Sequence, residues 1–463
     1  MKNKTRRLIT ILLCVIMAFQ TPVSAWAKTP EFESAEKYWI VGPGDNRAKE
    51  LAKARKQLCK YNGKNKKVTI PSRFTIIGSN AFEDNERMEV VVIPKTVTKI
   101  EARAFIRCKN LKQVVFEKGS KLKVIGEEAF DGCGNLKEIQ LPDSVTRLGD
   151  KVFYGCSKLE NIELSQNITY IPHEMFVYCT SLREIHIPKK VKSIKSEAFA
   201  SCTNLKTIYF NKQLKTIGSY AFKGCKDIEK LDLCGNNLTI EIQAFEDCNK
   251  LKTVQLPASV KCIEYHAFES CKNLEMVTTK GTTNQNGKGT IEKEAFINCR
   301  NLKSVRIPRS IGILGKNIFD DDYKIDEIII ENPNIQLEDI SIFDMTPWLE
   351  NKIDEDETVI VGGVLLNVGA DIMDAYTKAM EENGFFAMDG VLLDSNKTGK
   401  IQIPEGITKI GHINWRGTVT EIICPSSLKE IGDHAFKDQT KLNKITLNTN
   451  LKIIGDSAFQ GCT

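Results

Sequence analysis

The sequence GEEAFDGCGNLKEIQLP, Gly126–Pro142, recurs in nearly the same form along the chain, and this recurrence determines the fold. Counted from its phenylalanine, Phe130, cysteine stands at +3, leucine at +6, isoleucine at +9, leucine at +11 and proline at +12. Valine, leucine and glycine follow at +15, +18 and +19, and the next phrase has its phenylalanine at +23. These offsets define one repeat unit.

The phenylalanine at the origin of each unit, which we call the anchor, recurs every 23 residues over the first nine units, with one gap of 25. The anchors are Phe82, Phe105, Phe130, Phe153, Phe176, Phe199, Phe222, Phe245, Phe268, Phe296, Phe319, Phe343, Phe436 and Phe459. Trp415 stands four residues after a glycine, as Phe436 does, and is interpreted as a substituted anchor, which gives about 15 units. So short and regular a period predicts a solenoid, since one unit cannot bury its apolar side alone.

The slots of the unit predict short strands joined by turns. Apolar residues at +9 and +11 alternate with polar residues at +8 and +10, so one side of a strand faces the core. Proline at +12 cannot donate to a strand ladder and ends it, and glycine at +19 permits a turn. The predicted fold class is a repeat solenoid of about 15 units of ~23 residues, mostly short β-strands with short helical turns at each Ala-Phe pair.

The phrase from Cys248 to Phe268, CNKLKTVQLPASVKCIEYHAF, is one close match to a known pattern. It resembles the BspA-like leucine-rich repeats of bacterial surface proteins, and the matching units cover most of Val68–Thr463. The resemblance implies an extracellular interaction protein, with adhesion to host or matrix components as a common theme. It specifies no ligand, because such scaffolds carry varied binding roles.

The first 27 residues are expected to be a secretory signal peptide. A basic start is followed by the apolar run Leu8–Phe19 and by small residues at Ala25 and Ala27. That run is too short for a membrane span, and no later stretch approaches about 18 continuous apolar residues. We expect a secreted, extracellular protein, free or attached to the cell surface, with no transmembrane segment in the mature chain.

The rest of the chain divides according to how closely it follows the offsets of the repeat unit. The expected segments are a linker and helical cap at 28–67, the main leucine-rich repeat array at 68–343, an irregular segment with a helix at 344–410, and further repeats at 411–463. We expect the last repeats to be truncated, because the strand that should follow Thr463 is missing.

Three local features refine these segments. Asp45 is expected to start a helix that runs to about Tyr61. Gly281–Gly289 is expected to be a polar loop inserted in the array. In the irregular segment, Asp371–Asn383 is expected to be a helix, and two Gly-Val-Leu-Leu phrases on either side of it are each expected to be a strand.

Ten cysteines occupy the +3 slot, which we call the thiol slot: Cys108, Cys133, Cys156, Cys179, Cys202, Cys225, Cys248, Cys271, Cys299 and Cys462. Identical slots project their Cβ atoms in parallel, which suits a disulfide poorly, and one cysteine per layer does not converge on a zinc ion. We expect these thiols to be free, buried and structural. Cys59, Cys234, Cys262 and Cys424 lie outside the slot, and the sequence gives them no pairing.

Charge and motifs argue against several function classes. The whole chain carries a net charge of +6, and loss of the four basic residues of the signal peptide leaves +2, which gives no electrostatic case for nucleic acid. No nucleophile, phosphate loop or zinc-protease helix is recognisable, and His266 and His434 are interpreted as surface decoration. We therefore expect a protein that is not an enzyme and that uses no cofactor or metal.

The outward strand positions, +8 and +10, are the candidate ligand-binding face. The predicted site residues are Gln113, Glu138, Gln140, Asn161, Glu163, Glu184, His186, Thr207, Tyr209, Lys230 and Asp232. Carboxylates with an aromatic ring and amides could hydrogen-bond a sugar or pair with a basic protein patch. The alternative for each of them is a solvated position with no ligand.

The main hypothesis is a secreted or cell-surface interaction module, an adhesin, that binds a host, matrix or glycan ligand through this face. The partner would be an extracellular protein or glycan. The alternative is the carbohydrate- or cell-wall-binding region of a larger secreted enzyme, and a passive structural spacer is a third reading.

Overall fold

The computed structural model describes residues 32–34, 56–283, 287–332, 335–338, 340–343, 346–354, 359–361, 364–367, 385–388, 391–415 and 417–462. The expected signal peptide and the expected helix at Asp371–Asn383 lie outside these residues. The chain forms two compact units, Met1–Lys190 and Val191–Thr463, and each is described by itself.

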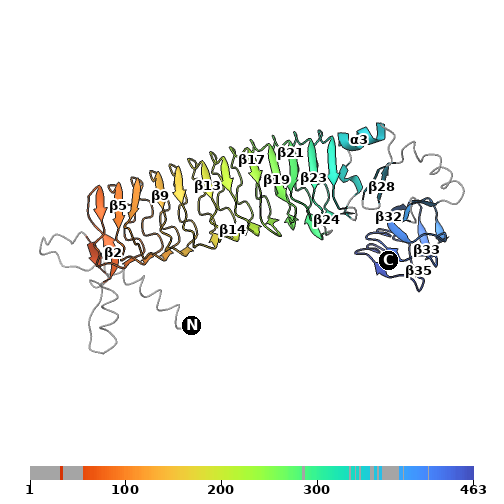
Figure 1. Ribbon diagram of the computed structural model, residues 1–463, viewed down its shortest axis with the longest axis horizontal. Coiled ribbons are helices and arrows are strands. Elements are labelled where there is room, and N and C mark those ends of the chain that lie inside the picture. Colours follow the sequence, from red (N-terminus) through yellow and green to blue (C-terminus); the bar gives the residue numbers. More distant parts are fainter. Residues whose placement is uncertain are drawn as a thin grey trace, which may run out of the picture. The chain divides into compact units, whose positions relative to one another are not determined.

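The first unit is a parallel β-solenoid in which every turn contributes one strand to each of two sheets (Figure 1). The first sheet contains β3 (Lys67–Thr69), β5 (Val90–Ile93), β7 (Gln113–Phe116), β9 (Glu138–Gln140) and β11 (Asn161–Glu163), and β13 (Glu184–His186) follows. The second contains β1 (Phe32–Ser34), β2 (Gln57–Tyr61), β4 (Ile76–Ile77), β6 (Lys99–Ile100), β8 (Val124–Ile125) and β10 (Arg147–Leu148), and β12 (Tyr170–Ile171) follows. Equivalent slots pair, so that Ile162 lies beside Ile139.

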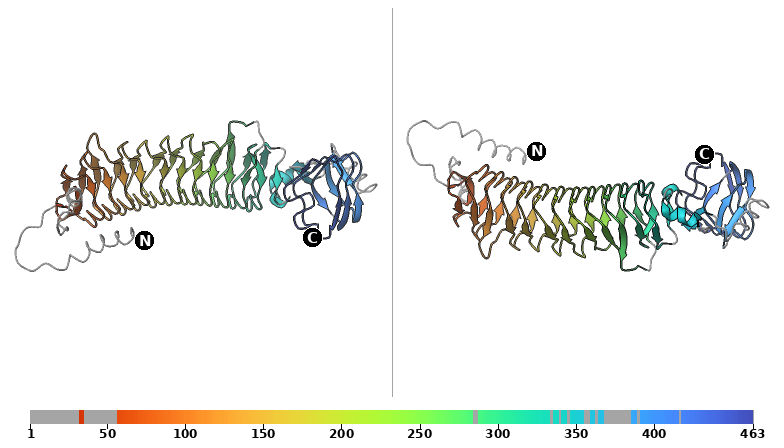
Figure 2. Two further views of the ribbon diagram at one scale, coloured as in Figure 1. Left: turned by 90° about the horizontal axis from the view of Figure 1, so that it is seen from below. Right: turned by 90° about the horizontal axis from the view of Figure 1, so that it is seen from above.

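The second unit repeats this plan through the rest of the main array (Figure 2). Strands of the first kind are β15 (Thr207–Tyr209), β17 (Lys230–Asp232), β19 (Thr253–Pro257), β21 (Met276–Lys280), β23 (Ser304–Ile307) and β25 (Glu327–Ile330). Strands of the second kind are β14 (Ser193–Ile194), β16 (Thr216–Ile217), β18 (Thr239–Ile240), β20 (Cys262–Ile263), β22 (Gly289–Ile291), β24 (Ile311–Leu314) and β26 (Gln336–Leu337). The polar insertion begins after β21, and its last residue, Gly289, is the first of β22.

The irregular segment is followed by two further small sheets. Its described elements are η3 (Ile340–Phe343), α3 (Pro347–Asp354), β27 (Val359–Val361), β28 (Val364–Asn367) and β29 (Phe385–Met388). The later strands are β30 (Val391–Ser395), β32 (Lys409–Trp415), β34 (Glu430–Ile431) and β36 (Ile453–Ile454) in one sheet and β31 (Gly399–Gln402), β33 (Val419–Ile423) and β35 (Lys444–Thr446) in the other. Both Gly-Val-Leu-Leu phrases are confirmed as strands, β28 and β30, and each pairs with an antiparallel strand before it.

Stacked anchor rings form the centre of the core. In the first unit, consecutive rings from Phe82 to Phe176 lie 4.7 to 5.7 Å apart between centroids, with planes within 13° of parallel. Phe199 to Phe296 repeat the stack in the second unit at 5.0 to 5.2 Å. Trp415 is confirmed as a substituted anchor, because its ring stacks on Phe436 at 5.5 Å. Offset ring pairs of this kind add stability beyond the area they bury.

The turn around each anchor is not helical, which corrects the expected helical turns. Around Phe130 the chain is left-handed both before and after the anchor, with a φ of +54° at Glu128 and +68° at Gly132. The same pair of positions is left-handed around most anchors, and a left-handed residue interrupts a right-handed helix. Short turns closed by i→i+3 hydrogen bonds result, such as Asp131 N to Glu128 O at 3.2 Å.

Nine of the ten slot cysteines are buried and Cys462 is half-buried, and no disulfide joins the described cysteines. Cys133 donates its thiol to the backbone carbonyl of Phe105, the anchor of the preceding turn, at 3.2 Å. Eight other slot cysteines make the equivalent bond, at 3.0 to 3.4 Å. Burial raises the pKa of Cys156, which keeps its thiol protonated and unreactive. The expectation of free, structural thiols is confirmed for these residues.

Asp322 occupies the thiol slot of one turn and lies in the same buried position. Its side chain is 2% exposed, and neither carboxyl oxygen has a hydrogen-bond partner. Burial raises the pKa of Asp322 to about 9, while the nearby backbone N–H of Cys299 has a smaller, opposing effect. This carboxyl group is therefore neutral at pH 7.

The expected helix from Asp45 to Tyr61 is wrong over Gln57–Tyr61, which is β2. Residues 45–55 lie outside the described part of the chain. β2 pairs with β4 in the second sheet, and the ring of Tyr61 lies 5.1 Å from that of Phe82. Tyr61 thus acts as an additional anchor. The spacing of Leu51 and Leu58 fits a helix, but burial of Leu58 beneath the second sheet stabilises a strand instead.

The irregular segment contains a helix that sequence patterns did not predict. α3 begins at Pro347, a residue suited to the first position of a helix. Thr346 caps it, since the Leu349 N–H lies 3.4 Å from the Thr346 hydroxyl oxygen. Among the described residues, no helix has both the length and the apolar character that crossing a membrane requires.

Candidate binding groove

The eleven predicted site residues are all exposed. Seven belong to the first unit, on β7, β9, β11 and β13, and four belong to the second unit, on β15 and β17. They point outward because strand residues alternate, and their neighbours at +9 are buried or half-buried on the core side. The sequence therefore placed each of them correctly on the outer face of a strand.

The parallel register brings the predicted site residues of the first unit into two rows that cross the strands. The first row contains the +8 positions and the second row the +10 positions. Gln113 pairs with Glu138, and Glu138 pairs with Asn161. In the second row, Gln140 donates its amide to Glu163 at 2.5 Å. The side chains of Gln113, Glu138 and Asn161 have no hydrogen-bond or ion-pair partner among the described residues. The first row therefore presents polar groups that a ligand could pair.

A groove of about 1170 Å³ lies over these rows. Six of the predicted residues line it: Gln113, Glu138, Gln140, Asn161, Glu163 and His186. Glu184 does not line it, although one of its oxygens is 3.9 Å from His186 Nε2. The groove is thus formed by the turns of β7, β9 and β11 with one side chain from β13.

One wall of the groove was not predicted from the sequence. It is the segment Phe116–Ser120, which begins at the last residue of β7 and contains Gly119 at a φ of +77°. This turn lies in the one gap of 25 residues, so two extra residues extend it where several other turns have proline at +12. Asp143, Ser144 and Gln166 come from the equivalent parts of the next turns. The irregular gap was the available signal for this wall.

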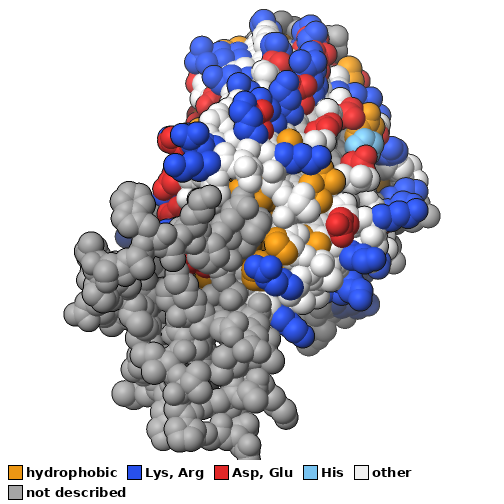
Figure 3. Space-filling model, turned by 90° about the vertical axis from the view of Figure 1, so that its left-hand side faces the viewer, with side chains coloured by type: hydrophobic (Ala, Val, Ile, Leu, Met, Phe, Trp, Pro, Cys, Tyr) orange, Lys and Arg blue, Asp and Glu red, His pale blue; other side chains and the backbone are white. Residues whose placement is uncertain are grey.

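The groove is acidic. Its lining includes the carboxylates of Glu117, Glu138, Asp143 and Glu163, but Lys118 is its only lysine or arginine. Phe116 and Val115 add apolar surface at one end. Elsewhere on this unit acidic and basic side chains are interspersed, as Figure 3 shows for one side. A groove with a surplus of carboxylates favours cationic or hydroxyl-rich ligands.

The four predicted residues of the second unit have different surroundings. Thr207 and Tyr209 lie on β15, and Tyr209 is 47% exposed. Lys230 and Asp232 lie on β17, and Asp232 pairs with Lys280 at 3.2 Å. None of these four residues lines the groove described above.

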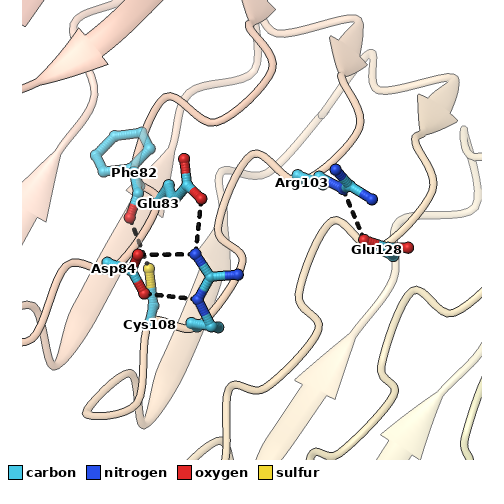
Figure 4. A network of polar contacts seen from close by, with 7 residues as sticks. Phe82, Glu83, Asp84, Arg103, Cys108 and Glu128 are labelled. Carbon is cyan, nitrogen blue, oxygen red and sulfur yellow. Dashed lines mark hydrogen bonds and ion pairs between the residues drawn. The ribbon is translucent and has the colours of Figure 1, made fainter.

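Most other charged clusters are ion pairs between neighbouring turns. The guanidinium of Arg107 contacts Asp84 at 2.7 and 2.8 Å and Glu83 at 2.7 Å, while Arg103 contacts Glu128 at 2.7 Å (Figure 4). The hydrogen bond from Arg107 lowers the pKa of Asp84. These exposed pairs contribute little each to stability, and they connect adjacent layers.

His266 is not surface decoration, which corrects the expectation from its slot. Its side chain is 16% exposed, and its two ring nitrogens lie 2.6 Å from Glu269 and 2.6 Å from Glu294. His266 thus bridges two carboxylates, one in its own turn and one in the next turn. Within the described part of the chain, no three His, Cys, Asp or Glu side chains converge as metal ligands.

Comparisons with solved structures give several leucine-rich repeat proteins. One from Bacteroides ovatus is 22% identical, with 88% of this chain and 87% of that chain covered and a TM-score of 0.44. A leucine-rich cell surface protein from Faecalibacterium prausnitzii is 23% identical, with 59% and 90% covered and a TM-score of 0.33. The pneumococcal vaccine antigen PcpA is 22% identical, with 60% and 80% covered and a TM-score of 0.30. The comparison with curated proteins gave no match.

The family comparison covers most of the chain. The model of the BspA-type leucine-rich repeat region matches residues 53–121, 116–229, 169–289, 279–363 and 392–463. Its repeats form solenoids, which generally act as scaffolds for protein interactions. With its 23-residue turns, stacked anchors and paired short strands, the chain belongs to the BspA-type leucine-rich repeat family.

Proposed function

We propose that the protein is a secreted or cell-surface adhesin, and that the groove over β7, β9 and β11 binds its extracellular partner. The observation that carries the proposal is the groove itself, in which six of the predicted residues line about 1170 Å³. Glu138 and Asn161 offer polar groups there that have no partner among the described residues. A role in binding, and not in catalysis, is consistent with the repeat family.

The charge of the groove selects the partner. Four carboxylates beside one lysine favour a segment that carries lysine or arginine. The three strands lie about 5 Å apart, so the groove floor spans roughly 10 Å. An extended peptide of about three residues covers that distance. We therefore propose a short basic segment of a host or matrix protein as the ligand, with a neutral glycan as the competing outcome of the test.

The test is binding of residues 28–463 to a panel of matrix proteins, a lysine-rich peptide and a glycan array. The test variant carries Glu138→Ala, Asn161→Ala and Glu163→Ala. We expect saturable binding by the wild type and a loss of roughly 10-fold or more in the variant, because charge-assisted hydrogen bonds are removed. Circular dichroism should show the same fold for both proteins.

A matched control removes the same chemical groups elsewhere. Glu229→Ala, Asn236→Ala and Asp326→Ala take two carboxylates and one amide from exposed positions of the second unit. This control should bind as the wild type does. Unchanged affinity in the groove variant, or an equal loss in the control, would contradict a binding role for the groove.

A further inference from the structure

The lysines of the second unit are concentrated in its first turns. Residues 191–226 contain seven lysines, no arginine, no aspartate and one glutamate, Glu197. Residues 126–186 of the first unit contain ten acidic and five basic residues. The charges of the chain nearly balance in total, but they are separated along the array. The near-neutral total therefore does not describe the local field.

Four of these lysines gather around the second-sheet strands β14 and β16. Lys192 and Lys215 fill the same slot in neighbouring turns, since Lys215 N donates to Lys192 O at 2.9 Å. The strands that follow them pair in register, with Ser193 beside Thr216. We call Lys192, Lys195, Lys212 and Lys215 the lysine cluster.

The other two members lie close to this pair. Lys195 directly follows β14 and lies against the next turn, because a Cβ atom on Gly218 would be 2.7 Å from the Lys195 carbonyl carbon. It occupies the slot that has glycine in several other turns. Lys212 precedes Lys215 by three residues on the loop that enters β16. The cluster thus spans two consecutive turns.

The lysine cluster is exposed and lacks counter-charges. All four side chains are exposed, and none has an ion-pair partner among the described residues. Other lysines of this unit differ, since Lys223 pairs with Glu246 at 2.7 Å and Lys250 with Asp227 at 2.7 Å. Like charges in adjacent strands are destabilising, so an unneutralised set of this kind is suited to an external anion.

We propose that the lysine cluster binds a linear anionic polysaccharide that carries sulfate, phosphate or carboxylate groups and crosses the turns of β14 and β16. Lysine is a strongly hydrated point charge that suits such groups without fixed geometry. The neighbouring exposed or half-exposed side chains are the hydroxyls of Ser193 and Thr216 and the amide of Gln213. This site is distinct in residues and in charge from the acidic groove of the first unit.

The surroundings favour a polysaccharide over two other anionic partners. Single-stranded nucleic acids bind where bases can stack on aromatic rings or arginine, and neither the lysine cluster nor the two strands it flanks, β14 and β16, contain such a residue. A membrane surface would favour apolar side chains that insert beside the lysines, whereas the neighbours here are hydroxyls and an amide. Charge complementarity with a hydrated, sugar-based polyanion fits both observations.

The test uses residues 28–463 with dextran sulfate as the probe and neutral dextran as its uncharged counterpart. The test variant replaces all four lysines of the cluster by glutamine. We expect the wild type to bind dextran sulfate and not dextran, with affinity that falls as salt is added. The variant should bind roughly 10-fold or more weakly, as four exposed charge pairs are lost.

A matched control changes the net charge by the same amount. It replaces four lysines that already pair with carboxylates, Lys151, Lys223, Lys250 and Lys303, by glutamine. This control should stay within about twofold of the wild type, because it leaves the cluster intact. An equal loss in both variants, or no binding by the wild type, would overturn the proposal.

Further arms separate the competing partners. Tighter binding to a single-stranded RNA oligonucleotide or to phosphatidylserine vesicles than to dextran sulfate would overturn the assignment to a polysaccharide. Salt-sensitive dimers in sedimentation, lost in the glutamine variant, would instead indicate contact with the acidic groove of a second copy. The groove variant with three alanines should bind dextran sulfate normally, so the two sites are tested independently.

Discussion

Replacing Asp322 should change how the stability of the protein depends on pH. The substitution Asp322→Asn keeps the shape of the protonated side chain but cannot ionise. The ordinary pKa of an aspartate carboxyl group is 3.8, and burial raises the pKa of Asp322 to about 9 in the folded protein. Because folding raises this pKa, the folded protein binds the proton more tightly. The free energy of unfolding that protonation of Asp322 contributes is fully present below pH 3.8 and is lost as the pH rises toward about 9.

The size of this loss follows from the two pKa values. Each pH unit between them lowers the free energy of unfolding by about 1.4 kcal/mol. At pH 7, a little over three units above the lower value, the wild type has lost about 4 kcal/mol relative to its stability below pH 3.8. The asparagine variant does not lose stability in this way, because its side chain cannot ionise. The stability difference between the two proteins should therefore grow in favour of the variant as the pH rises.

Urea unfolding of both proteins between pH 4 and pH 8 is the measurement, followed by circular dichroism. The slope of the difference against pH should approach about 1.4 kcal/mol per unit. Asp326→Asn is the control, since Asp326 is exposed and its replacement should give a flat difference. In infrared spectra at pH 7, the wild type should show a protonated carboxyl band that Asp322→Asn lacks. If the free energies of unfolding of the wild type and Asp322→Asn changed with pH in parallel, Asp322 would not have the raised pKa on which this prediction rests.

Three further predictions concern the core and the turns. Trp415→Phe keeps the stacked ring but removes the indole hydrogen bond of 2.9 Å to a backbone carbonyl, so it should lower the free energy of unfolding by about 1 kcal/mol. Trp415→Ala also removes the ring and should lower it by about 3–5 kcal/mol. Equal losses of stability in thermal unfolding would argue against the stack. Gly149→Ala would place a Cβ atom 2.3 Å from a backbone nitrogen of the preceding turn, so it should lower the free energy of unfolding by about 3 kcal/mol or more. In the control Gly134→Ala, the new Cβ atom would lie 3.6 Å from its nearest neighbour, and the melting temperature should stay unchanged. The slot thiols, such as Cys156, should resist a thiol reagent at pH 8 in the native protein and react fully after denaturation without reductant; failure of most to react when denatured would indicate disulfides.

The sequence predicted the core of the array well because the anchors repeat. A large ring at the same slot of every turn can only stack on its copies, and Trp415 could be assigned from its position after a glycine alone. Most second-sheet strands were missed because they have only two residues and bury one, such as Leu148 in β10, and two residues are too few for a period to appear. β2 was assigned as a helix for a related reason, since its partner strand lies downstream and leaves no local pattern.

The outward face of the site was predictable, and its concavity was not. Alternation along each strand identifies Glu138 and Asn161 as exposed, whatever lies around them. The wall at Phe116–Ser120 depends on how two extra residues are accommodated, which offsets alone do not specify. The lysine cluster is visible in the sequence only when charge is counted by segment, because Lys192 and Lys215 lie 23 residues apart and become neighbours through the fold.

The equivalence of the turns has a consequence for how such a gene can change. Most interfaces between turns repeat the same contacts, with a ring on a ring and a thiol on an anchor carbonyl. Unequal crossing-over between two repeats would therefore delete or duplicate whole turns and still join compatible surfaces. Each event would change the length of the array by about 5 Å. The groove needs the three consecutive turns of β7, β9 and β11, so it would survive recombination elsewhere in the array and be lost by recombination within them.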